Sequence, residues 1–123
     1  MARKVLVVED DPSILELFVI VLKEQGFGVH VCTNGKDAFF LAKRYLPSLI
    51  LLDLWIPDLS GEEVTRILKA NPETSHIPVV IVSAQNNLPQ IVKRIGADAY
   101  LSKPFDLDQL IVLTQKFAHQ NRH

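Results

Sequence analysis

Short apolar runs alternate along the chain with longer segments in which apolar residues recur every three or four positions. A continuous apolar run is typical of a strand buried on both faces, and the longer spacing is typical of an amphipathic helix. The two patterns alternate five times, which predicts a parallel sheet with crossover helices. The expected strands are Lys4–Val8, Val29–Thr33, Leu49–Asp53, Val79–Val82 and Ala99–Leu101.

Capping and terminating residues delimit the helices. Asp11 before Pro12 predicts an N-cap followed by proline at the first helical position, and Ser60 with Glu63 has the spacing of a capping box. The expected helices run from Pro12 to Gly26, from Lys36 to Tyr45, from Ser60 to Asn71, from Leu88 to Gly96, and from Asp106 through Phe117.

Acidic residues stand at the ends of two expected strands. Glu9 and Asp10 follow the first strand, and Asp53 closes the third. Open α/β sheets place their chemistry at the carboxyl ends of the strands, and these acids meet only if the first strand lies beside the third. The pattern therefore predicts an α/β fold with a doubly wound five-stranded parallel sheet in the order 2-1-3-4-5. By the same logic Ser83 and Lys103, which follow the fourth and fifth strands, lie at this edge.

A divalent cation is expected among these acids. Carboxylates packed this closely repel one another unless a cation joins them. Hard oxygen ligands suit Mg²⁺, which needs few protein carboxylates and keeps several waters. We therefore expect a Mg²⁺ site at Glu9, Asp10 and Asp53, in which Mn²⁺ is able to replace Mg²⁺. Asp11 is expected to cap the following helix instead.

Composition narrows the class of protein. The chain has 123 residues with 48% hydrophobic content, which predicts a single domain over residues 1–123. A formal charge of -1, with scattered basic residues, argues against direct binding of nucleic acid. Cys32 is the only cysteine, so an intrachain disulfide is excluded and a buried thiol in the cytoplasm is expected. No apolar run reaches the length of a membrane span or a secretory signal.

Four motifs follow one another along the whole chain: Val7 to Pro12, Asp53 to Gly61, Val82 to Ala84, and Gly96 to Phe105. Together they resemble the receiver domain of two-component response regulators. The resemblance implies a flavodoxin-like (βα)5 fold. It also implies that Asp53 accepts a phosphoryl group from a sensor histidine kinase or a histidine phosphotransfer protein, and that the chain catalyses only its own phosphorylation and dephosphorylation.

The resemblance assigns further roles. The metal ligands become Glu9, Asp10, Asp53 and the backbone carbonyl of Trp55. Lys103 is expected to pair with a phosphate oxygen, with the Lys103–Pro104 peptide bond in the cis form. The phosphate would also be bound by the Ser83 hydroxyl and the backbone of Ala84.

A conformational switch is implied at two of these positions. In the family the hydroxyl at the position of Ser83 moves toward the phosphate, and the ring at the position of Tyr100 turns inward behind it. The alternative that Tyr100 is only a buried structural tyrosine stays open. The surface that binds a downstream target would comprise the fourth helix, fifth strand and fifth helix, and a weak homodimer is a further possibility.

Two positions are expected to control the water that hydrolyses the acyl phosphate. Trp55 lies two residues beyond Asp53, and Gln85 lies two beyond Ser83. The indole of Trp55 is large, and the amide of Gln85 cannot act as a base. Together they predict that water reaches the acyl phosphate with difficulty and that the phosphorylated form is long-lived. The alternative is that the indole points into solvent and shields nothing.

Two other classes of function match parts of the same pattern. A Mg²⁺-dependent aspartyl-phosphate phosphohydrolase of the haloacid dehalogenase type remains the alternative, but such enzymes carry a second acid where this chain has Trp55. A flavodoxin-like cofactor carrier would bring a flavin phosphate against the acids after the first strand, which repel it. The four histidines lack the spacing of a metal site, and whether the receiver stands alone or belongs to a longer protein stays open.

Overall fold

A computed structural model of the protein describes residues 3–120. Within this range strands and helices alternate as expected. The strands are β1 Lys4–Val8, β2 Gly28–Cys32, β3 Leu49–Asp53, β4 Val79–Ser83 and β5 Ala99–Ser102. The helices are α1 Pro12–Glu24, α2 Gly35–Tyr45, α3 Gly61–Ala70, α4 Leu88–Ile95 and α5 Leu107–Gln120.

The five strands form one parallel sheet in the order β2-β1-β3-β4-β5, which confirms the predicted topology. β1 lies between β2 and β3, with Val8 opposite Cys32 on one side and Leu52 on the other. The carboxyl ends of β1 and β3 are therefore adjacent, and the residues that follow them share one edge of the sheet.

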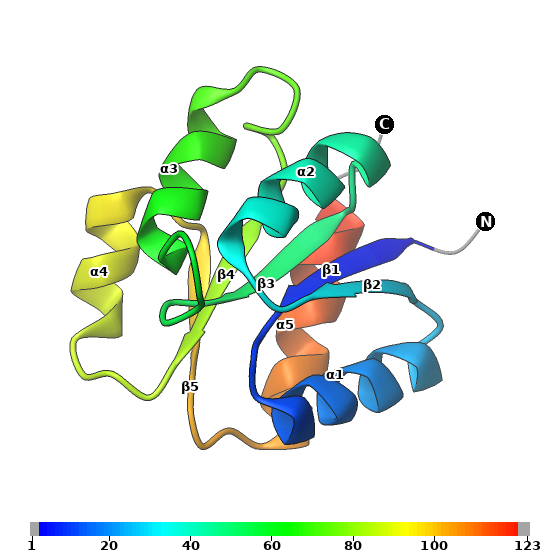
Figure 1. The fold of residues 1–123 in the computed structure, drawn as a ribbon. Coiled ribbons are helices and arrows are strands. Elements are labelled where there is room, and N and C mark those ends of the chain that lie inside the picture. Colours follow the sequence, from blue (N-terminus) through cyan, green and yellow to red (C-terminus); the bar gives the residue numbers. More distant parts are fainter. Residues whose placement is uncertain (1–2, 121–123) are drawn as a thin grey trace.

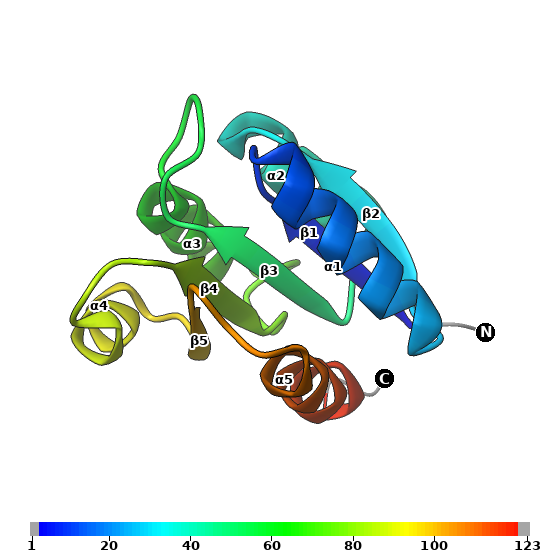
Figure 2. The ribbon, with the colours of Figure 1, turned by 90° about the horizontal axis from the view of Figure 1, so that it is seen from below.

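Two layers of helices cover the sheet (Figures 1 and 2). Helices α2, α3 and α4 pack over one face, and α1 and α5 pack over the other. The central strands are apolar because both of their faces are covered, and every residue of β3 and β4 is buried. This rigid support fixes the strand ends at which the acids lie.

The predicted caps form. The Asp11 carboxylate accepts hydrogen bonds from the backbone N–H groups of Ser13 and Ile14 at the start of α1. Ser60 and Glu63 form the capping box of α3. Asp11 is therefore engaged at the helix terminus, as its position before proline predicts.

Some boundaries differ from those predicted. β2 begins one residue earlier, because Gly28 already pairs with Lys4, and it ends at Cys32 rather than Thr33. α4 begins at Leu88, as predicted, although Asn87 before it has a left-handed backbone (φ 57°) and gives no side-chain cap. No helix in the described part of the chain is long and apolar enough to cross a membrane.

Candidate functional site

The three predicted acids converge at the carboxyl edge of the sheet. Glu9 follows β1, Asp53 ends β3, and with Asp10 they offer carboxylate oxygens that all lie within 4.8 Å of one another. Glu9 and Asp53 are only 1% and 7% exposed, whereas Asp10 faces solvent. Oxygen donors of this kind match the preference of Mg²⁺. The cluster is therefore able to hold a hard divalent cation.

Lys103 joins two of these acids. Its Nζ donates to Oε1 of Glu9 at 2.9 Å and to Oδ2 of Asp53 at 3.3 Å. The backbone N–H of Lys103 donates to the carbonyl of Ser83 at 2.9 Å, which fixes the segment after β5 against β4. The Lys103–Pro104 bond is cis, as expected. The ammonium group of Lys103 thus lies between the buried carboxylates of Glu9 and Asp53.

Burial and charge act against each other at this cluster. Burial raises the pKa of Glu9, although the hydrogen bond from Lys103 opposes the change. Burial works to lower the pKa of Lys103, but hydrogen bonds and attraction from Glu9 and Asp53 outweigh it, so that this pKa is raised. Lys103 is accordingly a permanent positive charge at neutral pH.

The second carboxylate oxygens of Glu9 and Asp53 accept hydrogen bonds from the backbone. The N–H of Trp55 donates to Oδ1 of Asp53 at 3.1 Å, and the N–H of Asp11 donates to Oε2 of Glu9 at 3.2 Å. Gly61 approaches so closely that a Cβ atom there would collide with the backbone carbonyl of Asp53. The Asp53 carboxylate is therefore oriented by its own turn, and the start of α3 packs closely against the Asp53 backbone.

Ser83 ends β4 and is 1% exposed. Its Oγ accepts a hydrogen bond from the backbone N–H of Gln85 at 3.1 Å, while Ala84 is exposed beside it. The hydroxyl is thus present at the expected edge, but it is engaged with the loop between β4 and α4.

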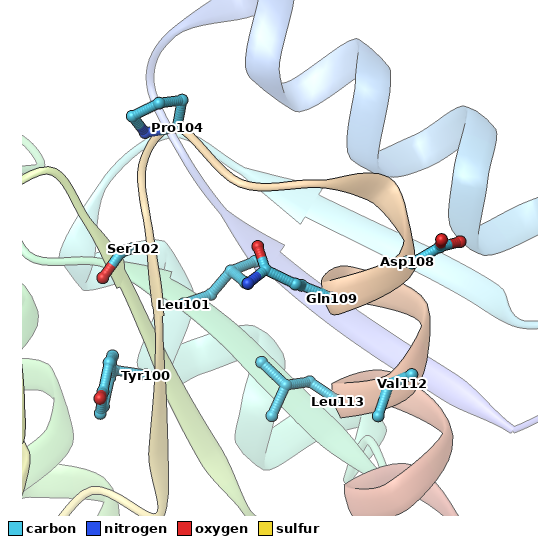
Figure 3. Close-up of a pocket in the computed structure, with 8 residues that line it drawn as sticks. All are labelled: Tyr100, Leu101, Ser102, Pro104, Asp108, Gln109, Val112 and Leu113. Atoms are coloured by element: carbon cyan, nitrogen blue, oxygen red, sulfur yellow. The ribbon is translucent and has the colours of Figure 1, made fainter.

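Tyr100 lies on β5 and is 39% exposed, so its ring does not occupy the core in this structure. It borders an open groove of about 610 Å³ between β5 and α5 (Figure 3). Leu101, Val112 and Leu113 give the groove its apolar lining, and Gln109 reaches across it toward the strand. The expected target-binding surface is therefore hollowed and partly apolar.

Trp55 and Gln85 line the same small pocket of about 170 Å³ beside the acid cluster. The Trp55 residue is 68% exposed and therefore borders the pocket without sealing it. This geometry matches the alternative in which the indole points into solvent. Control of water access by the two residues stays a prediction.

Two long-range ion pairs join residues that no local pattern brings together, one beside the site and one at the opposite edge of the sheet, where β4 begins. Glu62 in α3 accepts from Arg94 in α4 at 3.0 Å, and both line the pocket that Trp55 borders. Lys69 pairs with Asp98, whose carboxylate also accepts from the backbone N–H of Val79 at 2.8 Å. Their sequence separations, 32 residues for Glu62 and Arg94 and 29 for Lys69 and Asp98, exceed any helical or turn spacing.

Other candidates have structural roles. Cys32 is buried, and burial raises the pKa of its thiol to about 11, as expected for an unreactive cysteine. His30 stacks on Tyr45 with ring centroids 3.9 Å apart. Among the residues that the structure describes, the group of side chains close enough to share a metal ion is the acid cluster, and it contains no histidine. His123 lies outside the described residues.

Comparison with known families gives one match that covers most of the chain. Residues 5–115 match the model described as the response regulator receiver domain. The match spans β1 from Val5 onward, the other four strands and most of α5, and it includes every residue of the acid cluster.

Curated relatives agree with this match. The chain is 35% identical over 123 residues to the DNA-binding response regulator MtrA of Mycolicibacterium smegmatis, covering 98% of this chain and 53% of that protein. It is also 35% identical over 113 residues to the polar-differentiation response regulator DivK of Brucella anthropi, covering 90% and 92% of the two chains. The chain thus spans about half the length of MtrA and nearly all of DivK.

Solved structures share the fold. The Francisella response regulator 1452 receiver domain is 30% identical with a TM-score of 0.88, covering 98% of this chain and 99% of that one. The receiver domain of sensor histidine kinase PA1611 from Pseudomonas aeruginosa, solved with a magnesium ion coordinated in its active-site cleft, is 26% identical with a TM-score of 0.89, covering 97% and 99%.

Proposed function

The chain belongs to the response regulator receiver domain family, and we propose that it accepts a phosphoryl group on Asp53 in a Mg²⁺-dependent reaction. The donor would be a phosphohistidine of a sensor histidine kinase or of a histidine phosphotransfer protein. The observation that carries the proposal is the buried Asp53 carboxylate, held between Lys103 and the neighbouring acids at the edge of the sheet. Residues 1–123 would act as one phosphoacceptor unit.

The chemistry requires an ionised nucleophile. A carboxylate oxygen of Asp53 forms a bond to phosphorus while the bond from phosphorus to the donor imidazole breaks, and the electron pair remains on the nitrogen. Glu9, Asp10, Asp53 and the carbonyl of Trp55 would hold Mg²⁺, which supplies charge neutralisation for the incoming phosphoryl oxygens. The carboxylates of Glu9 and Asp10 would thereby hold the positive charge of Mg²⁺ beside Asp53, where the transfer needs it.

The product would be bound by groups already at the edge. Lys103 would exchange its bond to Asp53 for a phosphoryl oxygen, since its Nζ lies 3.3 Å from Oδ2. The Ser83 hydroxyl and the backbone N–H of Ala84 would donate to other phosphoryl oxygens. To reach the phosphoryl group the Ser83 hydroxyl would turn, which would change its hydrogen bond with the backbone N–H of Gln85. Phosphorylation of Asp53 would in this way affect the loop between β4 and α4.

The output of the switch would be the surface formed by α4, β5 and α5. A covalent phosphate favours one conformer only through contacts that are better in that conformer. The exposed ring of Tyr100 leaves it free to turn inward when Ser83 moves, which would reshape the groove along β5. A downstream protein that senses this surface would be the direct target.

Two other functions have less support. A phosphohydrolase acting on phosphate esters needs an acid to protonate the leaving group, and the position two residues beyond Asp53 holds Trp55. MtrA is named a DNA-binding response regulator, but the chain spans about half of that protein. We propose that this receiver itself makes no contact with nucleic acid.

The acceptor can be tested by intact-mass spectrometry after incubation with acetyl phosphate and Mg²⁺. We expect one added phosphoryl group in the wild type and none in Asp53→Ala, with the label lost in hydroxylamine as an acyl phosphate is. Equal labelling of the two proteins would remove Asp53 as the acceptor.

A further inference from the structure

A salt bridge connects the third and fourth helices beside the acceptor site. Oε2 of Glu62 accepts from Nη2 of Arg66 at 2.6 Å and from Nη1 of Arg94 at 3.0 Å. Arg66 is one turn further along α3, so its pair with Glu62 stays within one helix. Arg94 is in the last turn of α4, so its pair joins two helices.

The bridge forms part of the pocket next to the acceptor. Glu62 and Arg94 line the cavity of about 170 Å³ that Trp55 and Gln85 also line. Trp55 donates its N–H to Asp53, and Gln85 donates its N–H to Ser83. A change at either phosphate-binding residue therefore reaches this pocket through one hydrogen bond.

The start of α4 has few polar restraints. Asn87 supplies no side-chain cap, and residues 84–87 are all exposed. Helix α4 is held instead by its buried apolar side and, at the opposite end, by the Arg94 bridge. If Ser83 turns toward a phosphoryl group and releases Gln85, the first turn of α4 is free to move while the bridge opposes the movement.

We propose that Glu62 and Arg94 are a positioning pair that holds α4 against α3 in the unphosphorylated protein and so sets how readily the acceptor site takes a phosphoryl group. The inference rests on the function proposed above, because it assigns an effect on the same site. The pair is an exposed one, with side chains 27% and 55% accessible, so its contribution is modest and sensitive to salt.

The test is a titration with beryllium trifluoride, an anion shaped like a phosphoryl group, in the presence of Mg²⁺. Trp55 is the only tryptophan and borders the pocket, so its fluorescence reports binding. Removal of a restraint on the unphosphorylated form lowers the dissociation constant. We expect Arg94→Gln to bind about 1.5- to 5-fold more tightly than the wild type, the range for an exposed ion pair.

Matched variants separate the bridge from charge alone. Arg66→Gln removes the same charge from the same carboxylate within α3, and we expect it to bind like the wild type. Arg94→Lys retains a cation facing Glu62 and should restore most of the wild-type affinity. The ratio between wild type and Arg94→Gln should fall toward one as salt is raised, because screening weakens the bridge.

Each result has a defined meaning. The positioning role is overturned if Arg94→Gln binds no more tightly than the wild type, or if Arg66→Gln gains as much affinity as Arg94→Gln. In either case, binding of beryllium trifluoride that depends on Asp53 still supports the proposed function. If the wild type itself fails to bind beryllium trifluoride, or if Asp53→Ala binds as well, the proposed function fails and the inference with it.

Discussion

Lys103 donates to Glu9 across 94 positions of sequence, with Nζ 2.9 Å from Oε1. The Glu9 side chain is 1% exposed and that of Lys103 is 19% exposed, so water screens the pair weakly. The bond ties the segment after β5 to the end of β1 and compensates the charge of a buried acid. The acid cluster at this edge of the sheet is therefore assembled around Lys103.

Replacement of this lysine tests that role. Lys103→Met leaves the acids at Glu9 and Asp53 without their shared cation, which costs about 1–3 kcal/mol of unfolding free energy. Urea denaturation without divalent metal measures the loss. Lys93→Met, on the exposed side of α4, is the control and should unfold like the wild type. Equal stability of Lys103→Met and wild type would show that the pair contributes nothing.

Metal should stabilise the folded protein through the same acids. Mg²⁺ at 100 times its dissociation constant adds about 2.7 kcal/mol if it binds only the native state. Asp10→Asn removes an exposed carboxylate of the cluster and should lose most of this gain, although without metal it should be at least as stable as the wild type. Thermal melts over a Mg²⁺ series provide the measurement. An equal rise in both proteins would argue against Asp10 as a ligand.

Gly61 allows close backbone packing behind Asp53. A methyl group at this position would meet the carbonyl of Asp53 and Cα of Leu54, so Gly61→Ala should cost about 1–3 kcal/mol despite the better helix propensity of alanine. Gly28→Ala is the matched control, because its added Cβ would lie 3.6 Å from Lys4, an ordinary contact. Chemical denaturation of both variants decides the point, and equal effects would contradict the close packing at Gly61.

The lifetime of the phosphorylated form tests the residues beside the pocket. If Trp55 and Gln85 hinder water, then Trp55→Asn and Gln85→Glu should speed hydrolysis, and a barrier change of about 1.4 kcal/mol gives a tenfold shorter lifetime. The exposed indole makes Gln85→Glu the variant for which we expect the larger effect. Decay of the phosphorylated mass after removal of the donor gives the rates. Unchanged decay in both variants would end the shielding hypothesis and leave the receiver assignment intact.

Local sequence patterns are enough to predict the strands and helices and most of the residues at the carboxyl edge of the sheet. Apolar runs, helical spacing and caps are local signals, because they depend on the period of each element and on hydrogen bonds within one turn. The acids after β1 and at the end of β3 then placed β1 beside β3, since this adjacency brings Glu9 and Asp53 together. Asp11 as a cap and Cys32 as a buried thiol followed from the same local reasoning.

The pairing of distant side chains becomes visible only in the folded protein. The pairs of Lys103 with Glu9 and of Glu62 with Arg94 join residues far apart in sequence, and no spacing rule specifies them. The exposure of Trp55 and Tyr100 likewise depends on how neighbouring helices cover each position. Side-chain direction and long-range packing arise from the assembled layers, whereas periodicity and capping are already present in each segment of the chain.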